Sequence, residues 1–266
     1  MARQEIDLTT PQPNGRMGEP AKAAWQKVND MTLELYGDIE SLQVVDPTYI
    51  SGLGVEWVNG NTLKVLQGSA YIPGISRIAY LASDTNVSIS GIPSNTFGHL
   101  YLKANGTIEY SSVGPEARYA GYARTKIGDT STRYLFSFRV GASDIFRFSH
   151  SPESGLVLWV SNINSSPFSL VSGQSPTTAT SVSAAPVVPI TGTSVVMSIL
   201  NYGTALSYVL VSNSNGPSPP SGYFAVAGPG ASDYEIPVDV SRSYVYSYDS
   251  AGNSSFHRCR GYRFHR

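Results

Sequence analysis

The residues that could perform chemistry are scattered along this 266-residue chain. Its four histidines lack the spacing of a metal-binding pair on one helix, and they stand at positions 99, 150, 257 and 265. The sequence contains no glycine-rich phosphate loop, no dinucleotide-binding fingerprint and no Gly-x-Ser-x-Gly nucleophile elbow. We therefore predict no catalytic residue, no metal ligand and no bound cofactor.

One short segment gathers side chains that could form a catalytic group. Residues 126–133 read "KIGDTSTR" and bring Asp129, Ser131 and Arg133 close together in the sequence. An aspartate that follows glycine and precedes serine and threonine is more typical of a turn, in which the carboxylate accepts hydrogen bonds from backbone amides. We favour the turn over a catalytic role.

Glycoside hydrolysis is the enzymatic alternative. It needs two carboxyl groups, which need not be near each other in the sequence. The second half of the chain offers few acids for this role: Glu153, Asp233, Glu235, Asp239 and Asp249. We expect a protein that is not an enzyme and keep glycan hydrolysis as the minority interpretation.

Tyrosine is the most informative aromatic residue of the chain. Tyrosines outnumber phenylalanines by 17 to 9, and the segment "SYVYSYD" carries Tyr244, Tyr246 and Tyr248 on one face of a strand. We favour a buried face, in the core or between subunits, where each hydroxyl finds a hydrogen-bond partner. The alternative is an exposed ladder on which a sugar or protein partner lies, which makes these three tyrosines candidate receptor or glycan contacts.

The C-terminal segment "FHRCRGYRFHR" is rich in arginine: Arg258, Arg260, Arg263 and Arg266. These side chains could form a basic patch for phosphate or lipopolysaccharide groups. We favour a strand on which they balance the acids at 233–239 and 249. Cys259 is the only cysteine, which excludes an internal disulfide, and we expect it to be an inert small side chain.

Charge is scarce and unevenly distributed. Only 14% of the residues are charged, the net charge is −1, and residues 152–241 contain no lysine or arginine. This balance predicts neither a nucleic-acid nor a membrane partner, and such a surface is typical of a protein held in an assembly or exposed outside a cell. The sequence has no signal-peptide core and no apolar run that approaches 18 residues, so we expect synthesis in the cytoplasm and no membrane insertion.

The N-terminal region predicts an arm and a helix. Residues 1–18 contain prolines and glycines that prevent regular structure, and residues 19–43 carry a seam at alternating spacings of three and four. The apolar members of this seam are Trp25, Val28, Leu35, Ile39 and Leu42. Because so short a helix is marginal alone, the seam needs another surface. That surface is either the chain's own β domain or copies of the helix in a parallel bundle, which makes these five residues candidates for oligomerisation.

From Val55 onward the apolar residues alternate with a period of two, as in β-strands. Two Asn-Gly pairs, Asn59-Gly60 and Asn105-Gly106, lie between alternating runs and predict hairpins. The predicted fold is mainly β: an N-terminal extended arm and one short α-helix followed by two antiparallel β-sandwich-like domains. The first domain, residues 50–150, is a sandwich or a partly open barrel, and the second, residues 151–266, is a distal sandwich.

Three stretches resemble proteins of tailed bacteriophages. The opening "IDLTTPQPNGRMGEPAKAAWQKVNDMTLELYG" resembles the N-terminus of tail appendage proteins, in which an arm and a short helix precede β domains. The stretches "YISGLGVEWVNGNTLKVLQGSAYIPG" and "YAGYARTKIGDTSTRYLFSFRV" are similar to a β module of tail-fibre and baseplate proteins. The resemblance spans roughly residues 5–150.

The resemblance implies a homotrimeric, non-enzymatic virion component that is made in the host cytoplasm and fixed to other tail or baseplate proteins through its N-terminus. The β domains then face outward, where they are available to a host-surface glycan or protein. The candidate attachment residues in the arm are Ile6, Leu8, Pro11, Pro13 and Met17. Two alternatives stay open: a glycan-degrading tail protein, and a stand-alone carbohydrate-binding protein of the lectin type.

Overall fold

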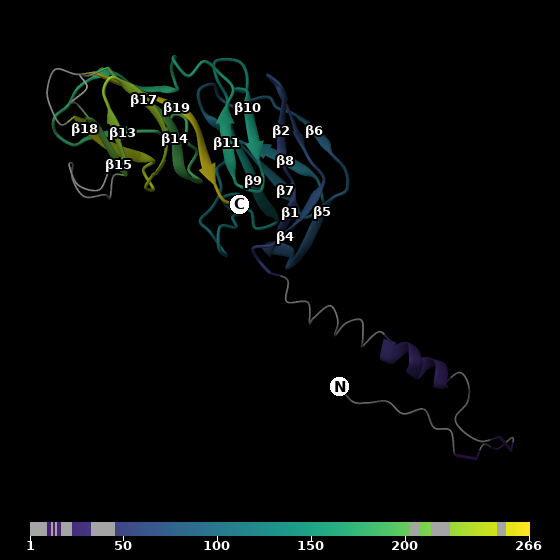
Figure 1. The fold of residues 1–266 in the computed structure, drawn as a ribbon. Helices are drawn as coiled ribbons and strands as arrows, with labels where there is room; N and C mark the ends of the chain where they lie inside the picture. The colour runs from purple at the N-terminus through teal and green to yellow at the C-terminus, as the bar shows by residue number, and fades with distance from the viewer. Residues whose placement is uncertain are drawn as a thin grey trace. The chain divides into compact units, whose positions relative to one another are not determined.

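The computed structural model describes residues 10, 11, 13, 15, 16, 23–32, 46–202, 208–213, 224–248 and 254–266, with only the backbone of residues 208–213 and 224–226. The chain divides into two compact units, Met1–Asp46 and Pro47–Arg266. Strands dominate the described residues and one segment is α-helical, which confirms the predicted mainly β class (Figure 1).

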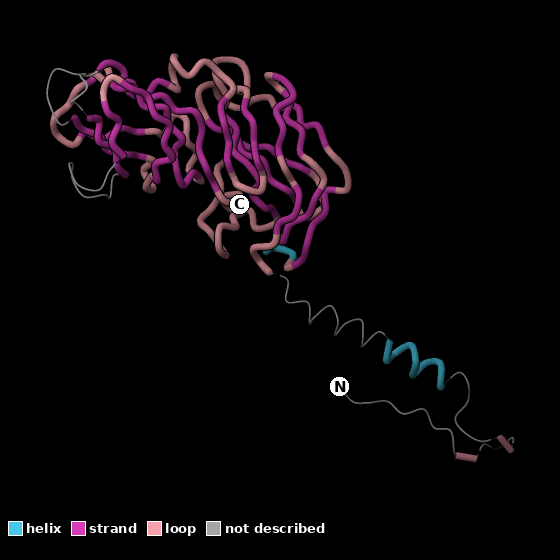
Figure 2. The backbone as a smooth tube through the Cα atoms, in the orientation of Figure 1, coloured by secondary structure: helices cyan, strands magenta, loops and turns pink. Residues whose placement is uncertain are grey.

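In the first unit, residues 23–32 form an α-helix (Figure 2). Contacts one turn apart support it, since Gln26 Nε2 donates to Asp30 Oδ1 at 3.0 Å and the Thr32 hydroxyl donates to the Val28 carbonyl at 2.7 Å. The predicted helix also includes 19–22 and 33–43, which lie outside the described residues. Within the described ranges, every helix falls short of the length and apolar character that a membrane span requires.

The described strands before residue 140 form three antiparallel sheets. Their orders are β1-β4-β5, β2-β3-β6 and β8-β7-β9. The strands are β1 (Ile50–Gly52), β2 (Val55–Asn59), β3 (Thr62–Val65), β4 (Gly68–Ile72), β5 (Arg77–Leu81), β6 (Thr85–Ser88), β7 (Phe97–Lys103), β8 (Ile108–Ser111) and β9 (Thr132–Arg139), with a 3-10 helix at Pro73–Ile75.

The described strands after residue 140 form a larger and a smaller antiparallel sheet. The larger has the order β10-β11-β19-β14-β17, with β12 also paired to β19, and the smaller has the order β13-β18-β15-β16. The strands are β10 (Phe148–Ser151), β11 (Leu156–Trp159), β12 (Ser169–Gln174), β13 (Thr180–Ser183), β14 (Gly192–Asn201), β15 (Tyr208–Asn213), β16 (Phe224–Ala227), β17 (Gly230–Pro237), β18 (Ser243–Tyr248) and β19 (Ser255–Phe264).

Both Asn-Gly pairs form the predicted hairpins. Asn59-Gly60 joins β2 to β3, and Asn105-Gly106 joins β7 to β8. Gly106 has a φ of +80°, and a Cβ at this position would lie 2.4 Å from the Tyr80 carbonyl oxygen. The second turn therefore requires glycine for its backbone conformation and for its packing.

The core of the second unit continues past residue 150. Every residue of β9 is buried, and the Tyr134 hydroxyl on this strand lies 2.8 Å from the Thr191 hydroxyl. The Tyr262 hydroxyl donates to the Ser137 carbonyl at 2.8 Å. Figure 1 shows β10 and β11 between β2 and β19. The division of this unit into two sandwiches near residue 150 stays a prediction.

These contacts predict how the second unit unfolds. Replacing Tyr262, which is fully buried, with phenylalanine leaves the Ser137 carbonyl without this donor and should lower the free energy of unfolding by about 1–2 kcal/mol. Because the contact joins β19 to β9, denaturant unfolding should remain a single transition for Y262F. Tyr80→Phe is the matched control, since Tyr80 is 65% exposed and should lose little. Two transitions, with only one shifted by Y262F, would contradict this expectation.

Candidate functional site

The segment at residues 126–133 forms the predicted turn. The Ser131 amide and hydroxyl donate to Asp129 Oδ1 at 3.0 and 2.6 Å, and the Lys126 amide donates to the Thr132 hydroxyl at 3.0 Å. The hydrogen bond from the Ser131 hydroxyl is the main cause that lowers the pKa of Asp129. The carboxylate of Asp129 therefore serves the turn, and no catalytic role is needed to explain it.

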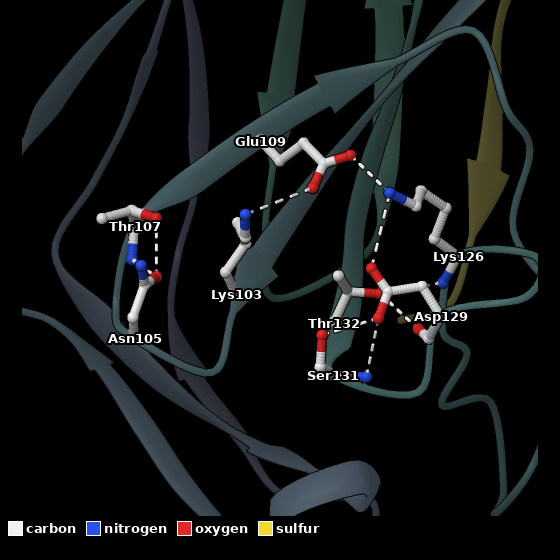
Figure 3. Close-up of polar contacts among 8 residues, drawn as sticks. All are labelled: Lys103, Asn105, Thr107, Glu109, Lys126, Asp129, Ser131 and Thr132. Carbon is white, nitrogen blue, oxygen red and sulfur yellow. Dashed lines mark hydrogen bonds and ion pairs between the residues drawn. The ribbon is translucent and has the colours of Figure 1, made fainter.

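Two lysines and a glutamate extend this turn into an ion-pair network (Figure 3). Lys126 Nζ lies 2.6 Å from Glu109 and 3.4 Å from Asp129, while Lys103 Nζ lies 3.9 Å from Glu109. The hydrogen bond to Glu109 is the main cause that raises the pKa of Lys126. The charges of these side chains are paired with one another, and the pairs join β7, β8 and the turn before β9.

Tyr244, Tyr246 and Tyr248 lie on a buried face, as the favoured interpretation predicts, and the alternative of an exposed receptor or glycan contact is wrong. The three side chains are 0%, 2% and 2% exposed, so no ring face is open to a sugar. The Tyr244 hydroxyl lies 2.9 Å from His257 Nδ1, and the Tyr248 hydroxyl donates to Asn201 Oδ1 at 3.3 Å. Alternation shows correctly that the three share a face of β18, but it does not show which face is buried.

Two of the four C-terminal arginines balance acids as predicted. Arg260 pairs with Asp233 at 2.7 Å, and Arg263 donates to both oxygens of Glu235 at 2.8 and 2.9 Å. These pairs join β17 to β19 across β14, the strand between them. The small serine side chains of β14 are paired with residues of both neighbouring strands. The hydrogen bond from Arg263 is the main cause that lowers the pKa of Glu235.

The other two arginines have different neighbours. Arg258 lies over the Phe256 ring, with 5.9 Å between its guanidinium carbon and the ring centroid. Arg266 donates from Nη1 to the Leu53 carbonyl at 2.6 Å and from Nη2 to the Gly52 carbonyl at 2.8 Å. The end of the chain is thereby tied to the segment between β1 and β2.

Arg266 also lines a pocket of about 740 Å³, a volume within the range of small-molecule sites. Five separate parts of the second unit form its wall: β1 with the residues that follow it, the end of β10 with the residues that follow it, the segment after β3, the segment before β9, and the end of β19. The side chains that offer chemistry to a ligand are Tyr122, Glu153, His265 and Arg266.

Two aromatic rings line this pocket, and a cation lies over one of them. The rings of Tyr122 and His265 lie 4.3 Å apart at an angle of 34°, and the guanidinium carbon of Arg118 lies 4.4 Å from the Tyr122 centroid. Such contacts hold the groups together through stacking and cation–π attraction. Because Tyr122 remains 43% exposed, a ligand can still touch it.

Arg266 remains a cation although it is partly buried. Burial is the main cause that lowers its pKa to about 10, and the nearby charge of Arg133 acts in the same direction. A group with this pKa is protonated at neutral pH. In the part of the chain that the structure describes, no carboxylate lies within ion-pair distance of Arg266 or Arg118.

The described helix presents large apolar side chains to solvent. Trp25 is 68% exposed, Val28 36% and Met31 40%. Pro11 and Pro13 of the arm are also exposed. The other candidates for oligomerisation and attachment lie outside the described residues: Ile6, Leu8, Met17, Leu35, Ile39 and Leu42.

Sequence reasoning missed most of the pocket. It named Arg266 in a basic segment, Glu153 as a candidate acid and His265 among the four histidines. It did not single out Tyr122, and it did not predict that these four side chains line one pocket, because only the fold brings the separate segments together. The described residues hold no group of three His, Cys, Asp or Glu side chains that could bind a metal ion.

Comparison with protein-family models and with curated protein sequences adds no relative. No protein-family model matches the chain, and no curated protein sequence matches it. A functional assignment therefore depends on the chain's own residues and on the resemblance of its short motifs.

Buried histidines predict a loss of stability in acid. Burial lowers the pKa of His150 to about 3, whereas the ordinary value is 6.5. Below pH 6.5 this histidine is therefore protonated in the unfolded chain but stays neutral in the folded chain. Each such histidine reduces stability by up to about 1.4 kcal/mol per pH unit. His99 and His257 are buried in the same way, with pKa values of about 4 and about 3.

His150→Gln should therefore flatten the decline of stability between pH 6 and pH 4 by about 1.4 kcal/mol per pH unit. Glutamine can still accept the hydrogen bond that the Val55 amide donates to His150 Nδ1 at 3.3 Å. Urea unfolding at several pH values measures the slope, and a slope equal to that of the unmodified chain would contradict the assignment.

Proposed function

We propose that this chain is a non-enzymatic structural component of a bacteriophage tail, a tail fibre or a baseplate appendage. In this proposal its N-terminal arm attaches it to other tail or baseplate proteins, its helix joins three copies, and its β unit contributes to contact with a host-surface glycan or protein. The observation that carries the proposal is the exposed apolar surface of the helix at residues 23–32.

Trp25 and Val28 supply the physical reason for self-association. The ten described helical residues would be marginal in water by themselves, and fully burying an apolar side chain of this size contributes roughly 1.5–3 kcal/mol. Three parallel copies of the seam would cover these side chains in a common core. The exposed prolines of the arm suit docking in an extended conformation, because they need no partner for a backbone N–H.

The pocket supports a binding role better than a hydrolytic one. A glycosidase of the usual kind holds two carboxyl groups across the scissile bond. Among the described residues that line the pocket, Glu153 is the only acid. This favours the non-enzymatic proposal over glycan hydrolysis.

Particle association tests the proposal. When the phage that encodes the chain is produced in its host, the chain should sediment with tailed particles. A Trp25→Glu, Val28→Glu double variant should remain in the supernatant, because two carboxylates at the seam would oppose the bundle by several kcal/mol.

The matched control is Val240→Glu, which places the same charge at a β-unit side chain that is 98% exposed. It should sediment with the particles as the unmodified chain does. An unmodified chain that stays free in the lysate while complete particles sediment would overturn the proposal.

A further inference from the structure

The guanidinium of Arg266, in the pocket at the end of β19, is held in a fixed position. Arg266 has five N–H groups, and two of them donate to the carbonyls of Leu53 and Gly52. These two contacts restrain the guanidinium, while its remaining N–H groups are available to a ligand. A restrained guanidinium is well suited to a planar carboxylate or to a phosphate, because little side-chain freedom is lost on binding.

Several other cations of the second unit have carboxylate partners. Lys64 pairs with Glu56, Lys126 with Glu109, Arg260 with Asp233 and Arg263 with Glu235. Within the described ranges, Arg266 and Arg118 have no such partner, and both lie beside the same aromatic pair. Partly buried positive charge that lacks a carboxylate favours an anionic ligand.

The aromatic pair adds a preference for a ring-shaped ligand. Tyr122 and His265 both line the pocket and remain exposed at its wall. Amphipathic rings of this kind contact the apolar faces of sugars while their polar atoms accept or donate hydrogen bonds. Glu153 is the one acidic side chain among the described residues of the wall, so it should oppose an anionic ligand and favour a neutral one.

We propose that this pocket binds a saccharide unit that carries a carboxylate or a phosphate group, with the anion on Arg266 and the sugar ring against Tyr122 and His265. The proposal deepens the proposed function, on which its biological setting rests, by naming the chemical class of the host-surface ligand.

Calorimetric titration of the full chain at low salt tests the proposal. The probes are a hexamer of galacturonic acid, glucose 6-phosphate and, as the neutral probe, maltohexaose. The unmodified chain should bind at least one anionic probe more than tenfold more tightly than maltohexaose. The galacturonate and phosphate arms show which anion the pocket prefers.

Substitutions at two exposed positions should change the affinity for the anionic probe in opposite directions. Arg118→Gln should weaken binding of the anionic probe several-fold, and Glu153→Gln should strengthen it. Arg266→Gln should abolish it, but this change also removes a contact to the β1–β2 segment, so the exposed variants decide. Arg77→Gln is the matched control, because Arg77 is exposed on β5 and does not line the pocket.

Absence of binding to both anionic probes, equal binding of maltohexaose, or weaker binding by Glu153→Gln would overturn the proposal. Particle association is measured independently. A chain that sediments with tailed particles but binds no anionic saccharide would leave the proposed function standing and remove this inference alone.

Discussion

The pairing of β19 with three other strands is the constraint on which the second unit depends. β19 pairs with β11, β12 and β14, so that one strand joins three segments spread between residues 156 and 201. Two glycines permit the approach of β11: a Cβ at Gly261 would lie 2.0 Å from the Val157 carbonyl oxygen, and one at Gly155 would lie 1.9 Å from the Phe264 carbonyl oxygen. Side chains at these positions would force the two strands apart.

The same constraint creates the pocket. Because β19 runs beside β11, it delivers His265 and Arg266 to the segments around β1, where Arg266 reaches the Gly52 carbonyl. The N-terminal end of the unit is held by another buried arginine: Arg133 is fully buried and donates to the carbonyls of Pro47 and Thr48 at 3.2 and 3.1 Å. Two cations thus fix both ends of the second unit through backbone carbonyls.

Local features could be predicted from the sequence, and tertiary ones could not. Two hairpins and one turn depend on a few adjacent residues each, so the sequence alone predicts them: the hairpins at Asn59-Gly60 and Asn105-Gly106 and the turn at Asp129. The mainly β class follows from the same alternation. That alternation could not show that Tyr246 is buried, because burial depends on the sheet packed against it. The pocket arises from five distant segments, so no single motif could indicate it.

We propose that the N-terminal segment assembles copies of the chain and that the β unit folds by itself. Native mass measurement of the full chain beside a chain of residues 46–266, which keeps the acceptors of Arg133, tests this most directly. The account predicts a threefold mass for the full chain and a folded monomer for the shorter one. Equal oligomeric states for the two chains, whether monomer or trimer, would contradict it.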